Sequence, residues 1–226
     1  MNFLTVPKLR ELCRARGLDQ TGKKAELVAR LQKLYPTVAI SDAFNTVLHA
    51  AAAVVVLYKP TSGNEAAAIG FALVAIASFV GTLRFGFSTA FAPANESLAG
   101  LAAFVGLPLI GSGFLCSAVG YQEDSNGLLV AFTAACASIH VVARAYLSTE
   151  HLDLLKVLVN VFFFLSPALY YAYTQRQWLA AGGSLLFAFA AVVIGADREE
   201  FLFGVRRENL FHYAIGTAAL MLAESL

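Results

Sequence analysis

A length of 226 residues would suit one or two soluble domains, but a hydrophobic share of 58% and a mean hydropathy of +0.68 exclude an ordinary soluble protein. The formal net charge of +1 conceals two unlike parts, since residues 1–36 hold eight Lys and Arg against three acidic residues while residues 37–226 hold eight against twelve. We therefore predict an all-α protein with a small basic head, residues 1–36, on a polytopic membrane body, residues 37–226.

The head is predicted to form two short amphipathic helices joined by a loop. Apolar side chains repeat along one face of each helix: Leu9, Leu12 and Cys13 in the first, and Leu27, Val28 and Leu31 in the second. Thr5 and Thr21 are expected N-caps, and Gly17 stands where the first helix should end. We expect Cys13 to pack inside the head.

The spacing in the head resembles the SAP motif, a small module of two helices joined by an extended loop. The matching positions follow one another without a gap: Val6, Leu9, Leu12, Gly17-Leu18, Gly22-Lys23-Lys24, and Glu26 to Leu31. The resemblance implies binding of nucleic acid, usually duplex DNA, through the N-terminus of the second helix and nearby basic side chains. The candidate contacts are Arg10, Arg14, Arg16, Gly22, Lys23, Lys24 and Arg30.

The basic charge of the head is also compatible with two roles besides nucleic-acid binding. Lys and Arg ahead of a first membrane span hold that end on the cytoplasmic side whatever else they do. A module of this size can also bind a protein. Topology explains the charge of the head but not the spacing of Gly17-Leu18 and Gly22-Lys23-Lys24, so this spacing indicates a folded recognition module.

The body is predicted to cross the membrane seven times. Apolar runs near the roughly 20 residues that a bilayer requires occur at about 40–58, 66–83, 97–119, 127–146, 154–174, 178–196 and 209–225. With the head in the cytoplasm or nucleoplasm, fourteen of the sixteen Lys and Arg fall on that side, leaving Lys59 and Arg176 on the other. We therefore expect an integral membrane protein in contact with the lipid bilayer, with its C-terminus on the side opposite the head.

Polar and ionisable residues recur within the predicted spans, where they are costly and thus functional candidates. They are Asp42, Asn45, His49, Ser78, Thr82, Arg84, His140, Arg144, Asn160, Asp197, Glu208, Asn209 and His212. The helical spacing of Asp42, Asn45 and His49 places these three on one face of the first span.

Two hypotheses account for these residues. The first is a zinc site that activates water for hydrolysis, in which the candidate ligands are His49, His140 and His212 and the candidate catalytic groups are Asp42, Ser78 and Glu208. The second is a structural network of hydrogen bonds and ion pairs, such as Asp42 with Arg144 or Asp197 with Arg84.

A second resemblance concerns the body. Seven spans, Asn45-Thr46 in the first, Ser78 late in the second and residues 210–216 at the start of the seventh are similar to the alkaline ceramidase and progestin/adiponectin receptor-like membrane hydrolases. The resemblance implies a zinc ion held by histidines of the second and seventh spans, with a Ser and an Asp nearby.

The sequence departs from that family at its ligand positions. No His follows Ser78, and Glu208 stands four residues before His212, where those enzymes have a second His. Glu96, expected in a loop, is a candidate for the acidic residue. Either the ligand set is rebuilt with His49 and His140, or only the scaffold resembles the family.

From these observations we predict a membrane anchoring protein whose head tethers DNA, RNA or a protein partner to a membrane. One alternative is a zinc-dependent hydrolase of lipid amides or esters. A second alternative is an accessory subunit whose helices pack against other membrane proteins.

Overall fold

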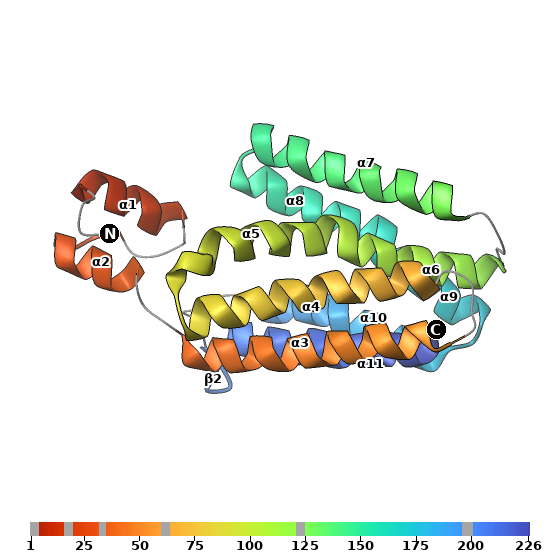
Figure 1. Cartoon of the computed structure of the whole chain (residues 1–226). Helices are drawn as coiled ribbons and strands as arrows, with labels where there is room; N and C mark the ends of the chain where they lie inside the picture. The colour runs from red at the N-terminus through yellow and green to blue at the C-terminus, as the bar shows by residue number, and fades with distance from the viewer. Residues whose placement is uncertain (1–4, 16–19, 32–34, 60–63, 121–124, 196–200) are drawn as a thin grey trace.

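The structure, a computed structural model, describes residues 5–15, 20–31, 35–59, 64–120, 125–195 and 201–226. The chain is mostly helical, with a two-helix head beside one end of a long helical bundle and the C-terminus at the other end (Figure 1). The prediction of an all-α architecture is confirmed at this level. One two-stranded hairpin is the exception among the described residues.

The head consists of α1 (Val6–Ala15) and α2 (Lys24–Leu31). The two helices share a small core made of the predicted faces, with Val6 packed against it: Leu9, Cys13, Leu27 and Val28. The position of Cys13 inside the head is confirmed. Gly17-Leu18 and the side chains of Leu12 and Leu31 lie outside the part of the chain that the structure describes.

The two expected N-caps have different outcomes. The carbonyl of Thr5 accepts the N–H of Leu9 at 3.0 Å, so Thr5 holds the N-cap position of α1. The carbonyl of Lys23 accepts the N–H of Leu27 at 3.1 Å, and α2 begins at Lys24, so Lys23 holds the N-cap position of α2. The position predicted at Thr21 was therefore two residues too early, because the loop continues further than its sequence indicated.

The body begins with α3 (Pro36–Leu57) and α4 (Asn64–Gly86). A 3-10 turn η1 (Thr89–Phe91), α5 (Ala92–Leu101), a π-helical turn η2 (Ala102–Gly106) and α6 (Leu107–Val119) then follow as one continuous helix. The next helices are α7 (Ser125–Tyr146), α8 (Thr149–Asn160), the π-helical η3 (Val161–Leu165) and α9 (Ser166–Thr174). The chain ends with α10 (Trp178–Phe189), the π-helical η4 (Ala190–Ile194), the hairpin strands β1 (Phe201–Leu202) and β2 (Val205–Arg206), and α11 (Arg207–Ser225).

Each predicted span overlaps a helix or a continuous run of helical segments. These helices differ in length and hydropathy. Within the described part of the chain, four helices are long and apolar enough to cross a membrane: Pro36–Leu57, Asn64–Gly86, Thr89–Val119 and Glu150–Thr174. A shorter apolar helix covers Trp178–Ile194, and α7 and α11 are not among the four. By length and composition four of the described helices could therefore cross a membrane, and the count of seven stays a prediction.

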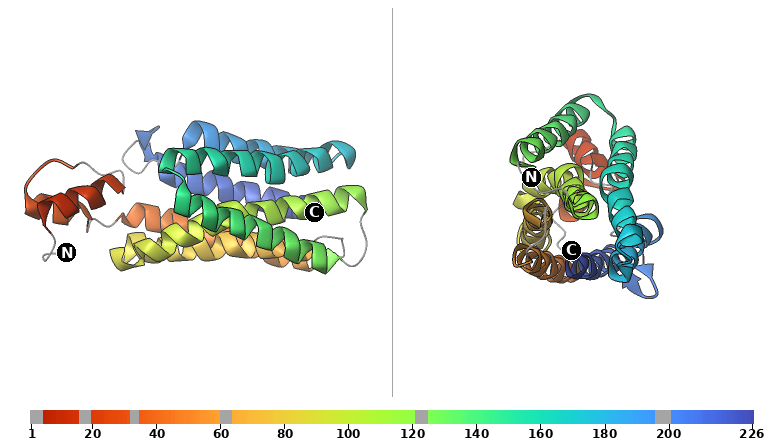
Figure 2. Two further views of the ribbon diagram at one scale, coloured as in Figure 1. Left: turned by 90° about the horizontal axis from the view of Figure 1, so that it is seen from above. Right: turned by 90° about the vertical axis from the view of Figure 1, so that its right-hand side faces the viewer.

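The helices of the body form a ring. α3 packs between α4 and α11, α11 packs on α10, α10 on α9, and α9 closes the ring against α6, which packs on α4 (Figure 2, right). α7 lies outside this ring and contacts α5 and η2. Three fully buried phenyl groups, Phe71, Phe114 and Phe164, belong to the main core, whereas buried Phe104 packs on His140 of α7.

Two π-helical turns precede a proline and mark close helix contacts. Pro108 follows η2, and Pro167 follows η3. A proline inside a helix lacks an N–H donor and its ring collides with the carbonyl four residues earlier, so a widened turn relieves the collision. A Cβ at Gly111 of α6 would overlap the carbonyl oxygen of Phe163 in η3. Small residues therefore bring these backbones together.

Candidate nucleic-acid interface and polar network

The head exposes basic side chains on both of its helices. Arg10 and Arg14 of α1 lie four residues apart and are exposed, as are Lys23 and Lys24 at the start of α2. The Arg14 Nε donates to Gln20 Oε1 at 3.2 Å, which ties this guanidinium to the loop before α2. Arg16 and the side chain of Arg30 lie outside the described residues.

A carboxylate already occupies the N-terminus of α2. The Lys23 N–H donates to Glu26 Oε2 at 3.1 Å, which is one half of a capping box. Gly22 has φ +108°, and a Cβ there would overlap the same oxygen, so only glycine fits both the backbone and the carboxylate. One of the N–H donors at the start of α2, that of Lys23, is therefore held by Glu26. Sequence reasoning did not assign Glu26 to the cap, although its position three residues after Lys23 was the signal.

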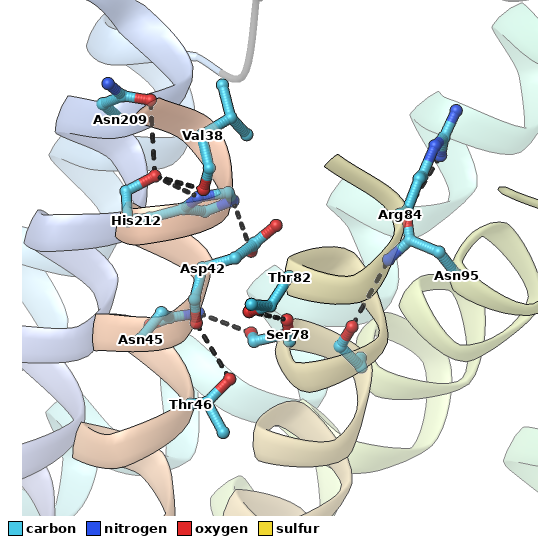
Figure 3. A network of polar contacts seen from close by, with 12 residues as sticks. Val38, Asp42, Asn45, Thr46, Ser78, Thr82, Arg84, Asn95, Asn209 and His212 are labelled. Carbon is cyan, nitrogen blue, oxygen red and sulfur yellow. Dashed lines mark hydrogen bonds and ion pairs between the residues drawn. The ribbon is translucent and has the colours of Figure 1, made fainter. Parts of the chain in front are cut away.

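In the body, the polar residues of α3 and α11 form one network near the head end of the bundle (Figure 3). Ser41 Oγ donates to the Val38 carbonyl at 2.9 Å and lies 3.1 Å from His212 Nδ1. The other ring nitrogen, His212 Nε2, lies 3.3 Å from Asp42 Oδ1. Asn209 Oδ1 lies 3.3 Å from Ser41 Oγ. The sequence indicated Asp42, Asn209 and His212, but not the serine between them.

The same face of α3 also reaches α4. Asp42, Asn45 and His49 are all buried, which confirms that they share one face. Asn45 Nδ2 donates to Ser78 Oγ at 2.7 Å. A Cβ at Gly81 would overlap Asp42 Oδ2, so glycine gives this carboxylate its room. Asp42 and Asn45 therefore sit between α4 and α11, which fixes the rotation of all three helices.

Arg84 of α4 is bonded to two side chains of α5. Arg84 Nη2 lies 3.1 Å from Glu96 Oε1, and Nη1 donates to Asn95 Oδ1 at 2.9 Å. The proposed partner Asp197 lies outside the described residues. Glu96 was expected in a loop, but α5 begins at Ala92 and places it on a helix beside α4.

Asp42 was expected to pair with Arg144, but the two lie in different contacts. Arg144 Nη1 donates to Ser97 Oγ at 3.0 Å, while Asp42 pairs with His212. The reason is that α7 packs against α5 and η2, on the outside of the ring and away from α3.

The three histidines proposed as zinc ligands are separated. His212 contacts Ser41 and Asp42, and His49 Nδ1 lies 3.0 Å from the Asn45 carbonyl. His140 of α7 packs on Phe104, with 5.0 Å between the ring centroids. No group of three His, Cys, Asp or Glu side chains in the described segments is arranged to hold a metal ion.

The other catalytic candidates are buried at different places in the body. Glu208 is buried in the first turn of α11, and Ser78 of α4 is bonded to Asn45 rather than to a histidine. A single zinc site built from all three histidines is therefore not the arrangement that the structure describes.

Comparison with known proteins identifies the head alone. Residues 4–36 match the family model of the SAP domain, which confirms the resemblance seen in the head. No curated protein and no solved structure matches the chain. The match covers a small part of the chain, so it describes the head and leaves the body to be argued from its own residues.

Proposed function

We propose that this protein is a membrane anchor whose SAP domain faces the cytoplasm or nucleoplasm and tethers nucleic acid, or a protein partner, to the membrane. The observation that carries the proposal is a separately packed SAP domain with exposed basic residues, joined by a short connection to a body of long apolar helices. The head has its own core, so it supplies a recognition surface, while the body supplies the attachment.

The distribution of charge supports the proposed orientation. The body begins at the head end, so alternate connections return to that end (Figure 1). Arg84 near the end of α4, Arg144 near the end of α7, and Arg206 and Arg207 at the start of α11 all follow this alternation. An excess of Lys and Arg marks the cytoplasmic side of a membrane protein, so the head is assigned to that side.

Nucleic acid is the first partner to test because phosphate neutralisation has a distinct signature. Each phosphate contact made by Lys or Arg contributes about −0.9 to the slope of log K against log salt on duplex DNA. The test uses the full chain in nanodiscs of zwitterionic lipid and measures duplex binding at several salt concentrations. We expect the double variant Lys23→Glu/Lys24→Glu to lose binding and the unmodified chain to show a steep salt dependence.

The control keeps the charge change but moves it away from the head. Lys156→Glu/Arg176→Glu removes the same charge from two positions in the body, and we expect it to bind as the unmodified chain does. Absence of salt-sensitive binding to both duplex and single-stranded nucleic acid would reject the nucleic-acid form of the proposal and leave a protein partner as the tethered molecule.

A second candidate function, hydrolysis of a lipid amide or ester, is favoured by one specific contact set. Ser41 Oγ, the His212 ring and Asp42 Oδ1 are placed in the order nucleophile, base and carboxylate, with separations of 3.1 Å and 3.3 Å. In this reaction the Ser41 hydroxyl turns its proton from the Val38 carbonyl to His212 Nδ1, and Oγ attacks the acyl carbon. His212 takes the proton and passes it to the leaving group, and water then releases the acyl group. This form requires no zinc, unlike the ceramidase-like form.

Covalent labelling separates this candidate from a structural network. A fluorophosphonate probe should label the full chain, and Ser41→Ala should abolish the label while Ser78→Ala keeps it. Labelling that is absent, or that survives Ser41→Ala, rules out Ser41 as a nucleophile and leaves the network as a structural bond between α3 and α11.

A further inference from the structure

The connection between η4 and α11 contains a β-hairpin with a defined turn. Phe201 pairs with Arg206 and Leu202 with Val205 in antiparallel register. Phe203 and Gly204 form the two-residue turn, with φ values of 54° and 77°. Positive φ at both central residues is typical of a type I′ turn, whose twist matches paired strands. The hairpin therefore presents its tip in a fixed direction.

The tip of the hairpin is apolar and exposed. Phe203 is 93% exposed and Phe201 is 60% exposed. Leaving a phenyl side chain in water forfeits the favourable free energy that its burial would give. A non-glycine residue at positive φ adds backbone strain at the same place. Two exposed phenyl groups on a short hairpin thus indicate a surface that another molecule covers in the cell.

Arginines hold the base of the hairpin against the body. The Arg206 guanidinium lies 5.3 Å from the ring centroid of Tyr35, which immediately precedes α3, and 5.0 Å from that of Phe201. Arg207 donates to the carbonyls of Val193 and Ile194 at the end of η4. These contacts fix the base of the hairpin between α3, η4 and α11, so the position of its exposed tip is set by the body.

The place of the hairpin points to lipid as the covering partner. It lies at the head end of the bundle (Figure 1) and projects sideways, outside the ring of helices rather than over its end (Figure 2, right). Beside it, η4 exposes Val192 and Val193, at 80% and 51%, so the apolar outer surface of the bundle continues into the hairpin. If the helices cross a membrane, a sideways projection at their end lies at the level of the lipid headgroups, where apolar side chains such as Phe can be buried at the boundary between headgroups and acyl chains.

We propose that Phe201 and Phe203 insert into the headgroup boundary of the leaflet on the head side, and that the hairpin anchors the start of α11 at the membrane surface. The inference rests on the proposed membrane attachment of the body. Its consequence for the fold is that the depth of α11, and so of His212, is fixed by lipid contact as well as by helix packing.

The test uses tryptophan fluorescence of the full chain in liposomes. Trp178 is the single tryptophan of the sequence, so Trp178→Phe gives a silent background in which Phe203→Trp is the only reporter. Lipids brominated at shallow or deep acyl positions quench a nearby indole, and aqueous iodide quenches an exposed one. We expect Phe203→Trp to be quenched more strongly by the shallow than by the deep bromolipid and to be shielded from iodide several-fold relative to Ala25→Trp, an exposed head position.

Two further variants keep the result decisive. Phe201→Trp reports from the same hairpin if the tip variant fails to fold, and Val47→Trp reports from an exposed position, 64% accessible, on α3. Quenching of Val47→Trp by the deep bromolipid establishes that the body is in the bilayer. When that control is positive, either of two results at the hairpin overturns the inference. In the first, iodide quenches the hairpin tryptophan, which shows that the hairpin is in water. In the second, neither bromolipid nor iodide quenches it, which indicates that protein covers the hairpin. A Val47→Trp reporter that bromolipid fails to quench refutes the membrane body itself.

Discussion

Removing the charge of Glu26 should strengthen nucleic-acid binding by the head. The carboxylate of Glu26 lies at the N-terminus of α2, where its Oε2 accepts the Lys23 N–H at 3.1 Å. A phosphate that reached the same N–H groups would come within about 4 Å of this carboxylate, and two like charges at that separation in water repel by about 1 kcal/mol. Glu26→Gln removes the repulsion, so we expect about a fivefold gain in affinity at low salt.

Glutamine is the informative substitution because it keeps the helix cap. Its side-chain oxygen can still accept the Lys23 N–H, so the capping box is retained while the charge is lost. The assay is duplex DNA binding by the full chain in zwitterionic nanodiscs at about 50 mM and about 200 mM salt, where the gain should shrink as the phosphate contribution falls. Glu65→Gln is the matched control, because it makes the same charge change at an exposed position at the start of α4.

An unchanged or lower affinity for Glu26→Gln, with helix content preserved by circular dichroism, would refute the reasoning. That result would mean that phosphate does not approach the start of α2, and that any nucleic-acid contact is made elsewhere on the head, for instance by Arg10 and Arg14 of α1.

Two predictions concern the body. Gly111→Ala should destabilise the bundle by about 1–3 kcal/mol or more, because the new methyl group meets the backbone carbonyl of Phe163. Gly182→Ala is the control and should cost less, because its methyl group meets only the flexible end of a methionine. Thermal unfolding in detergent compares the two variants. Asp42→Ala should cost about 1–3 kcal/mol, because it leaves a buried ring nitrogen of His212 without its acceptor. Adding His212→Leu should restore part of that loss, and fully additive costs in the double-mutant cycle would show that the two side chains do not interact.

The faces of single helices were predictable because helical periodicity is a local property. Leu9 and Cys13 in α1, and Asp42, Asn45 and His49 in α3, are spaced three or four residues apart, and each set shares a buried face in the structure. The SAP domain was recognisable for the same reason, since its pattern of apolar, glycine and basic positions is contained within about 30 consecutive residues.

The partners of the polar side chains were decided by the tertiary structure. Ser41 and His212 are 171 residues apart in the sequence, and they meet because α3 packs on α11. Arg84 pairs with Glu96 because the helix that follows α4 begins earlier than its hydropathy predicted. His140 is kept from the other histidines because α7 lies outside the ring.

The sequence by itself determined that this protein has a basic SAP head and an apolar helical body, because composition and periodicity are recorded residue by residue along the chain. Only the tertiary structure decided that Ser41 joins Asp42 and His212, and that a fixed hairpin exposes Phe203 beside the bundle. Each of these depends on the neighbour order and rotation of helices, or on the conformation of a turn, and neither quantity is contained in the spacing of residues within one helix.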